Sequence, residues 1–314
     1  MTDPIAGVRI TWFSVANCLM EYEGGAVLID GYVSRLPRTV FGDDTEATTS
    51  VGPQISDPAA VRHAFESLGE PDVGVILTSH AHFDHTWDTA EWAKLTGATV
   101  VGTETVAQQC ISQGVELSQI RVVEGGEQLD LPGGVRCHVV RGNHGGNDKH
   151  RALGRQPRTL TSPPVPDDRT GGLRPGVHED FPNGGGSLSY LFVDDRQEPH
   201  RSWGHTASLS SFDFEEDVVV DGVNCGSPAN NLAAGMQAAG LTGVDLWLGP
   251  AAHTAHEAAK AILSPLSVVP MHWDDLFLPP EEDDTVYDLE ALRDIYGGDV
   301  DVRLPVHSEA FTLP

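Results

Sequence analysis

The sequence predicts an α/β fold in which two β-sheets pack face to face and helices cover their outer faces. Apolar runs of strand length alternate with helical patterns along the chain. This succession occurs twice, and each β-rich half is followed by helical segments. No stretch of linker composition divides the sequence, so we expect residues 1–314 to form a single domain.

The first half opens with two short β-rich runs at 8–13 and 26–30, which we expect to pair with each other. Asp57 followed by Pro58 then predicts the start of a helix over 57–69. An aspartate side chain caps the first backbone amides well, and proline suits the first helical position. Apolar residues recur on one face of this segment, as in an amphipathic helix.

A buried strand predicted at 74–79 leads directly into a cluster of histidines, and a helical pattern over 87–95 follows the cluster. The cluster therefore lies at the carboxyl end of a strand. The remaining elements of this half are expected as strands at 98–102, 119–124 and 135–140 and a helix near 104–113.

The second half repeats the alternation after a long segment without periodicity. Residues 142–186 are rich in Gly, Pro, Arg and Asp, and we interpret them as one active-site loop, because loops of this length in compact domains are usually functional or disordered. Thr254 and Glu257 fit a capping box for the last helix. The expected elements after the loop are strands at 188–193, 217–221, 245–249 and 266–271 and helices near 228–240 and 254–264.

Charge and composition exclude several classes of partner. The formal net charge of -27 opposes binding to nucleic-acid backbones and anionic membranes, since both attract positive patches. No run approaches the roughly 18 apolar residues of a membrane span, and the amino terminus lacks a basic region followed by an apolar one. The 4 cysteines have no CxxC spacing, which favours neither a disulfide framework nor a thiolate zinc site. We expect a cytoplasmic protein.

The segment 80–85 (HAHFDH) concentrates three imidazoles and a carboxylate. His80 and His82 are two residues apart, so their rings point the same way on an extended segment, while Asp84 and His85 follow where the chain turns. Imidazole nitrogen and carboxylate oxygen are the usual ligands of catalytic zinc. A solvated polar loop is the alternative interpretation, and the density of ligand-type residues favours a metal site.

This segment resembles the HxHxDH signature of the metallo-β-lactamase superfamily. The resemblance implies an αββα sandwich of two mixed β-sheets, with helices on the outer faces and metals between the sheets. In that family the first two histidines and a later one hold one metal, and the Asp-His pair and a final histidine hold the second. Carried over, the ligands are His80, His82 and His144 at the first site and Asp84, His85 and His272 at the second.

The sequence around the later histidines agrees with this assignment. His144 lies in 141–146 (RGNHGG) directly after a predicted strand, and its glycine neighbours would let the backbone approach a metal closely. His272 ends the predicted strand 266–271. Asp30 corresponds to the family's first motif, whose aspartate orients a ligand rather than binding the metal. For both histidines an ordinary loop position is the alternative.

The fourth motif departs from the family pattern. In relatives, a strand followed by Gly-Asp supplies an aspartate that bridges both metals, whereas the comparable segment 200–206 (HRSWGHT) holds no aspartate. Either His205 binds metal in its place, or another side chain such as Asp221 or Asn224 does, or the protein holds a single metal. A surface histidine at position 205 is an equal alternative.

The wider layout resembles the branch of the superfamily that contains ascorbate-6-phosphate lactonase-like and N-acyl-phosphatidylethanolamine phospholipase D-like proteins. The resemblance covers most of the chain, roughly 7–278, but only HAHFDH is specific by itself. The segments that carry it are Trp12-Phe13 before Leu28-Ile29-Asp30, the run 186–192 (GSLSYLF) and the run 268–272 (VVPMH).

The resemblance implies a metal-dependent hydrolase that uses metal-bound hydroxide to cleave a small-molecule lactone, ester or phosphodiester. Zinc is the expected cofactor, one or two ions per chain, although Mn²⁺ or Fe²⁺ would accept the same ligands. Asp84 is expected to act as general base while it binds metal. If Asp84, His85 and His272 hold a single metal, His80 or His82 is left for acid–base catalysis.

The long loop suggests the substrate, because basic residues outnumber acidic ones there in an otherwise acidic chain. Guanidinium groups match phosphate and carboxylate with paired hydrogen bonds, so we expect a small anionic substrate. A solvated loop that balances its acidic surroundings is equally consistent with this pattern. The basic residues are Arg141, Lys149, Arg151, Arg155, Arg158, Arg169 and Arg174.

Two other functions stay open. A single-zinc hydrolytic dehalogenase acting on a halogenated aromatic would suit the missing bridging aspartate, and a non-catalytic metal-binding relative would suit it too. We expect a small-molecule substrate as partner, no nucleic acid and no membrane insertion. A homodimer is expected only because dimers are common among soluble proteins.

Overall fold

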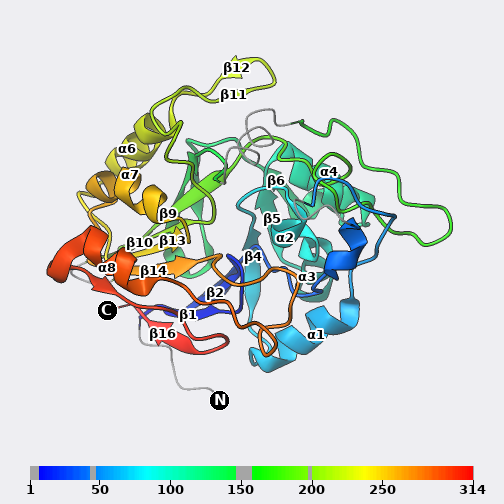
Figure 1. Cartoon of the computed structure of the whole chain (residues 1–314), viewed down its shortest axis with the longest axis horizontal. Coiled ribbons are helices and arrows are strands. Elements are labelled where there is room, and N and C mark those ends of the chain that lie inside the picture. The colour runs from blue at the N-terminus through cyan, green and yellow to red at the C-terminus, as the bar shows by residue number, and fades with distance from the viewer. Residues whose placement is uncertain (1–6, 43–46, 146–157, 197–199, 314) are drawn as a thin grey trace.

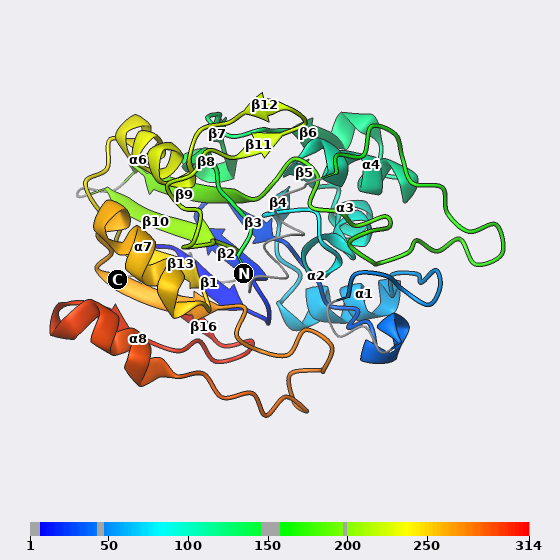
Figure 2. The same ribbon diagram turned by 45° about the horizontal axis from the view of Figure 1, so that its top comes forward.

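The structure, a computed structural model, describes residues 7–42, 47–145, 158–196 and 200–313. Two seven-stranded sheets face each other, and helices lie on the outer side of each sheet (Figures 1 and 2). Each sheet combines antiparallel and parallel neighbours. The predicted αββα sandwich of two mixed sheets is therefore confirmed.

The first sheet is built from the amino-terminal half and one carboxy-terminal strand. The runs at 8–13 and 26–30 were expected to pair, and this was wrong because a further strand lies between them. That strand is buried at every position, so it lacks the alternation that marks a half-buried strand. In spatial order the strands are β16 (Ala310–Thr312), β1 (Arg9–Trp12), β2 (Cys18–Tyr22), β3 (Gly25–Ile29), β4 (Val73–Leu77), β5 (Thr99–Gly102) and β6 (Ile120–Val122).

The second sheet is built from the later part of the chain. In spatial order its strands are β15 (Asp301–Val302), β14 (Ser267–Met271), β13 (Leu246–Pro250), β10 (Arg201–Thr206), β9 (Leu188–Asp194), β8 (Arg136–Arg141) and β7 (Gln128–Asp130). The strand expected at 217–221 belongs to neither sheet. It shortens to β11 (Val219–Val220), which pairs only with β12 (Val223–Asn224) in a separate hairpin.

Helices from each half cover the sheet of that half, on opposite sides of the molecule in Figure 1. One apolar core fills the space between the two sheets. A second core lies between the second sheet and its helices, and a third lies between the first sheet and its helices. None of the described helices has both the length and the apolar composition needed to cross a membrane. The α-helices are α1 (Pro58–Ser67), α2 (Phe83–Thr86), α3 (Thr89–Thr96), α4 (Glu104–Ser112), α6 (Pro228–Ala239), α7 (His253–Leu263) and α8 (Leu289–Tyr296), and the 3-10 helices are η1 (Arg38–Phe41), η2 (Leu117–Gln119), η3 (Pro132–Gly134) and η4 (Gly297–Asp299).

Of the two predicted helix caps, one is confirmed and the other is wrong. The Asp57 carboxylate accepts a hydrogen bond from the Ala59 amide at 2.9 Å, which confirms the cap of α1. The capping box at Thr254 is wrong, because α7 begins one residue earlier, at His253, and Ala252 occupies the cap position. Thr254 is therefore already inside the first turn, where its hydroxyl cannot cap.

The described parts of the long loop, 142–145 and 158–186, contain neither a helix nor a regular strand, as expected. They are nevertheless packed against the first half of the chain. Leu173 forms an isolated bridge with Gln54, and the buried Phe181 ring lies 4.9 Å from that of Trp87. Of the basic residues predicted to hold an anion, Lys149, Arg151 and Arg155 lie outside the described residues.

Candidate metal centre

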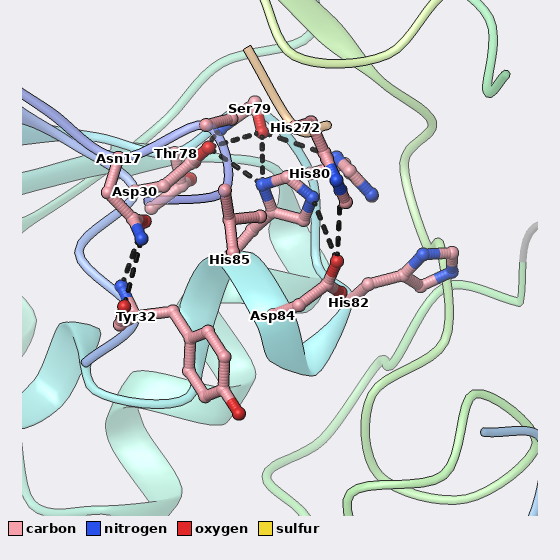
Figure 3. Close-up of polar contacts among 12 residues, drawn as sticks. Asn17, Asp30, Tyr32, Thr78, Ser79, His80, His82, Asp84, His85 and His272 are labelled. Atoms are coloured by element: carbon pink, nitrogen blue, oxygen red, sulfur yellow. Dashed lines mark hydrogen bonds and ion pairs between the residues drawn. The ribbon is translucent and has the colours of Figure 1, made fainter. Parts of the chain in front are cut away.

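Both sheets contribute residues to one edge of the sandwich, where strands end. His80 and His82 follow β4 in the first sheet, and Asp84 and His85 form the first turn of α2 directly after them. From the second sheet, one histidine follows β8 and another follows β14. Figure 3 shows the side chains of Asp84, His85 and His272 pointing toward one another.

The first group consists of His80, His82 and His144. One ring nitrogen from each lies within 4.8 Å of the others. Nε2 of His80 and Nδ1 of His144 are buried and make no hydrogen bond. Buried polar atoms nearly always have a partner, so these nitrogens have the character of metal ligands.

The electrostatics of this group favour neutral imidazoles, the form that binds metals. Burial, together with repulsion from the neighbouring rings of His85, His82 and His144, lowers the pKa of His80 well below its usual value. Burial also lowers the pKa of His144 to about 4. These two rings therefore present lone pairs near pH 7.

The second group consists of Asp84, His85 and His272. Oδ2 of Asp84 lies 3.1 Å from Nε2 of His272 and 3.4 Å from Nε2 of His85. Burial would raise the pKa of Asp84, but the two imidazoles outweigh it and hold the pKa well below its usual range. Asp84 is thus an ionised carboxylate between two imidazoles, a suitable ligand set for a divalent cation.

Asp30 lies behind the second group and orients His85. Its Oδ2 is 2.7 Å from Nδ1 of His85 and accepts a hydrogen bond from the Ser79 hydroxyl at 2.9 Å. Its Oδ1 accepts from the Ser79 amide at 2.7 Å. This geometry agrees with the interpretation that Asp30 orients a ligand and is not one itself. Ser79 was not singled out from the sequence, where a serine after a strand carries no distinctive signal.

Unusual backbone conformations position the outer residues of the site. Asp30 and His272 both have positive φ, 61° and 62°, which is uncommon for residues other than glycine. The Asn17 side chain fixes the turn after Asp30, since its Oδ1 accepts from the Gly31 amide at 2.8 Å and its Nδ2 donates to the Tyr32 carbonyl at 2.9 Å (Figure 3). Sequence patterns did not reveal Asn17, because its contacts depend on how β2 and β3 pair.

Hydrogen bonds through Val15 hold the backbone of His272 in place. Its amide donates to the Val15 carbonyl at 2.8 Å. The Val15 amide in turn donates to Oδ1 of Asp274 at 2.9 Å, and Oδ2 of the same carboxylate accepts from the Ser14 hydroxyl. Ser14 and Val15 both have positive φ, so the Asp274 carboxylate holds a strained turn against the end of β14.

His205 belongs to neither group. It lies in β10, it is fully buried, and its Nε2 is 3.0 Å from the Ala16 carbonyl oxygen. Burial lowers the pKa of its imidazole. Burial therefore contradicts the interpretation of His205 as a surface histidine. Its other ring nitrogen, Nδ1, is buried without a hydrogen bond, and among the described residues His205 is in neither candidate ligand group. Asp221 and Asn224 are exposed in the β11–β12 hairpin and are in neither group either.

A cavity of about 320 Å³ opens beside the two groups. Its polar lining is mainly metal-centre side chains together with Ser208, whose hydroxyl accepts from the Gly145 amide at 2.7 Å. None of the described lining residues is an arginine or a lysine, so the described arginines of the long loop lie elsewhere. The apolar lining consists of Ala47, Phe83, Val177, Ala207, Leu209, Pro250, Ala251, Ala252, Leu276 and Phe277.

Comparison with known families agrees with this geometry. A model of the metallo-β-lactamase superfamily matches residues 52–219, more than half of the chain. A UPF0173 metal-dependent hydrolase of Methanopyrus kandleri is 33% identical over 139 residues, which cover 42% of this chain and 50% of the relative. One of Rubrobacter xylanophilus is 31% identical over 117 residues, 37% of this chain and 38% of the relative. The chain therefore spans half the length, or less, of these relatives.

Solved structures show the same fold along nearly the whole chain. Igni18, a metallo hydrolase from Ignicoccus hospitalis, has a TM-score of 0.54 at 15% identity, and the match covers 98% of both chains. A possible metal-dependent hydrolase from Veillonella parvula has a TM-score of 0.53 at 12% identity over 98% of this chain and 100% of that one. Identities this low establish similarity of fold alone.

Proposed function

Since the chain belongs to the metallo-β-lactamase superfamily, we propose that it is a hydrolase that requires two divalent metal ions, with zinc as the expected ion. The observation that carries the proposal is the convergence of two groups of ligand-type atoms at one cavity. Five imidazoles and one carboxylate suit zinc and its neighbours in the transition series. The buried nitrogens without hydrogen bonds fit such ions as well.

A divalent ion bound here would lower the pKa of a water molecule and polarise a substrate oxygen. The chain's own residues supply the rest of the chemistry. Asp84 is ionised and lines the cavity, so we assign it as ligand and as the group that accepts the proton of the attacking water. His82 also lines the cavity, and we assign it as a ligand whose ring contacts the substrate.

We further propose a small, largely apolar ester or lactone as substrate. The cavity is large enough for a compact molecule, and apart from the metal-centre side chains its lining is mainly alanine, leucine and phenylalanine. Apart from metal ions bound at the two groups, no described lining residue would pair with a negative charge on the substrate. We therefore place the neutral carbonyl substrates first, and hydrolysis of a phosphodiester is the outcome that would reverse this order.

The test combines metal content with hydrolysis of p-nitrophenyl butyrate and bis-p-nitrophenyl phosphate. We expect two equivalents of metal per chain, one in His144→Ala and one in His272→Ala, with activity reduced by about 100-fold or more in both. His63→Ala removes an exposed imidazole from α1 and should change neither value. Metal-free protein, or a chain that hydrolyses neither probe when fully loaded, would contradict the proposal.

A second candidate is hydrolytic dehalogenation of a halogenated aromatic. Two observations favour it: Phe83 and Phe277 lie together in the cavity lining, and Asp84 is the only carboxylate in the two groups of described residues. Halide release from chlorinated aromatic probes, with one metal equivalent per chain and no esterase activity, would support this reaction over ester hydrolysis.

A further inference from the structure

A second cavity, of about 360 Å³, shares no lining residue with the cavity at the metal centre. It lies between α6, the end of β8 and the turn that joins β6 to β7. We call it the Arg141 cavity. Its described lining residues are Glu124, Gly125, Gly126, Glu127, His138, Val139, Val140, Arg141, Cys225, Asn231, Ala234, Gly235 and Ala238.

Two of its polar side chains are buried without hydrogen bonds. Arg141 is 7% exposed, and its Nε and Nη1 are buried and have no partner. His138 is 5% exposed, and its Nε2 is likewise buried without a hydrogen-bond partner. A buried guanidinium nitrogen without an acceptor is unfavourable, so the two such nitrogens of Arg141 indicate a ligand that supplies an acceptor.

The surrounding chain keeps the Arg141 side chain in place. A Cβ atom at Gly125 would lie 2.8 Å from both the Cβ and the backbone nitrogen of Arg141, so glycine is needed there. A Cβ atom at Gly186 would lie 3.2 Å from Nη1 of Arg141, which is a tight contact. Both glycines also have positive φ. The Asn231 side chain donates to the Arg141 carbonyl at 3.2 Å and fixes α6 beside it.

Nearby acids do not neutralise this guanidinium through direct contact. Among the described residues, no carboxylate forms an ion pair with Arg141. The Glu127 carboxylate instead accepts from the amides of Glu124 and Gly125, at 2.7 and 2.8 Å, within its own turn. The two glutamates therefore lie at the cavity as negative charges that would repel a dianion more than a monoanion.

We propose that the Arg141 cavity binds a small carboxylate with an apolar tail. The carboxylate accepts hydrogen bonds from Nε and Nη1 of Arg141, and the tail packs against the small residues Ala234, Gly235 and Ala238 of α6. A charged acceptor paired with a guanidinium forms the strongest hydrogen bonds available to such a site. The carboxylate has a single negative charge, so Glu124 and Glu127 repel it less than they would repel a dianion. The predicted anion-binding role of Arg141 is thus kept but moved away from the metal centre.

Calorimetric titration of the metal-loaded protein with butyrate tests the proposal, with butyramide as an uncharged probe of the same size. We expect one butyrate to bind saturably to the wild type. The Kd of butyramide for the wild type, and the Kd of butyrate for Arg141→Met, should both be at least about tenfold higher, because a charged hydrogen bond is lost in each case. Arg136→Met is the matched control, since Arg136 lies on the same strand but pairs with Asp195. Its Kd for butyrate should equal that of the wild type.

A second variant keeps the test decisive if Arg141→Met does not fold. Ala234 is exposed on α6, so Ala234→Leu fills the cavity without removing a buried charge, and it should abolish butyrate binding. Butyrate that binds the metal centre instead would keep its Kd in both variants. An unchanged Kd in both variants would overturn the proposal. So would tighter binding of inorganic phosphate than of butyrate, or the absence of any saturable binding.

Discussion

A single carboxylate outside the two metal groups sets the orientation of one ligand. Asp30 holds Nδ1 of His85, which leaves Nε2 facing Asp84. The same carboxylate accepts hydrogen bonds from the Ser79 amide and hydroxyl, and it therefore also positions the segment that carries His80. Partners of this kind fix the ring orientation of a metal-binding histidine and raise its basicity.

Asp30→Asn should weaken metal binding without unfolding the protein. Asparagine keeps the size of the side chain and tolerates positive φ, but it removes the charge that pairs with His85. We expect the affinity for one metal equivalent to fall by about 10–100-fold, measured by chelator competition. Asp72→Asn, at an exposed position, is the control. Equal affinity in all three proteins would show that Asp30 does not position the ligand.

His205→Ala should retain both metal equivalents. The imidazole contacts the Ala16 carbonyl and lies in neither ligand group, so its removal leaves a buried acceptor unpaired. We expect the free energy of unfolding to fall by about 1–3 kcal/mol. Elemental analysis and denaturant titration measure the two effects separately. Loss of one metal equivalent would instead make His205 a ligand.

His256 should make stability depend on pH. Its ring is buried between the Tyr296 hydroxyl, 2.9 Å from Nδ1, and the Pro250 carbonyl, 2.7 Å from Nε2, and burial lowers its pKa to about 4. The unfolded chain binds this proton more readily, at about pH 6.5. The contribution of His256 is therefore present above that pH and is lost as the pH falls toward 4, by on the order of 3 kcal/mol. His256→Gln should flatten the pH profile of unfolding over this window, and an unchanged slope would refute the assignment.

At the scale of elements, a turn between two strands of the first sheet supports a strand of the second. The turn between β1 and β2 contacts the end of β14 through Val15 and His272, and Asp274 holds it from the other side. Two consecutive residues with positive φ give this turn a conformation that the surrounding hydrogen bonds must maintain.

Asp274→Ala should therefore affect both stability and the metal centre. The Ser14 hydroxyl and the Val15 amide lose their acceptor, which we expect to cost about 1–3 kcal/mol in denaturant titrations. The backbone of His272 loses its support, so metal affinity should fall as well. Asp284→Ala, at an exposed position on the same connection, should change neither quantity. A stability change without any loss of affinity would limit Asp274 to a structural role.

At the scale of the whole molecule, each ligand group draws on both sheets. His80 and His82 follow a strand of the first sheet, whereas His144 follows a strand of the second. Asp84 and His85 likewise meet His272 from the opposite sheet. A metal ion bound at either group therefore links the two halves of the sandwich.

Removing metal should lower the thermal stability of the whole sandwich in one step. The ligands come together only in the folded chain, so bound metal stabilises the native state by about 4 kcal/mol at a concentration 1,000 times its Kd. Scanning calorimetry with and without a chelator should show a single transition with a lower Tm after chelation. Identical transitions would mean that the groups do not bind metal.

Features that depend on neighbouring residues could be predicted from the sequence. The cap at Asp57 is visible in two adjacent residues, and HAHFDH is a candidate ligand set that needs only a strand before it. The family resemblance then assigned His144 and His272, which the structure brings to the same edge as HAHFDH. The alternation of strands and helices was enough to predict the sandwich, because each buried face needs a partner.

Features that depend on contacts between distant segments could not be predicted and are seen only in the three-dimensional packing. The strand β2 was missed because burial on both faces removes its periodicity. The contact of His205 with Ala16 and the position of Arg141 in a separate cavity both arise from sheet and helix packing. Sequence patterns report which residues share a face within one element, whereas the distance between two elements is set by the packing of the whole core.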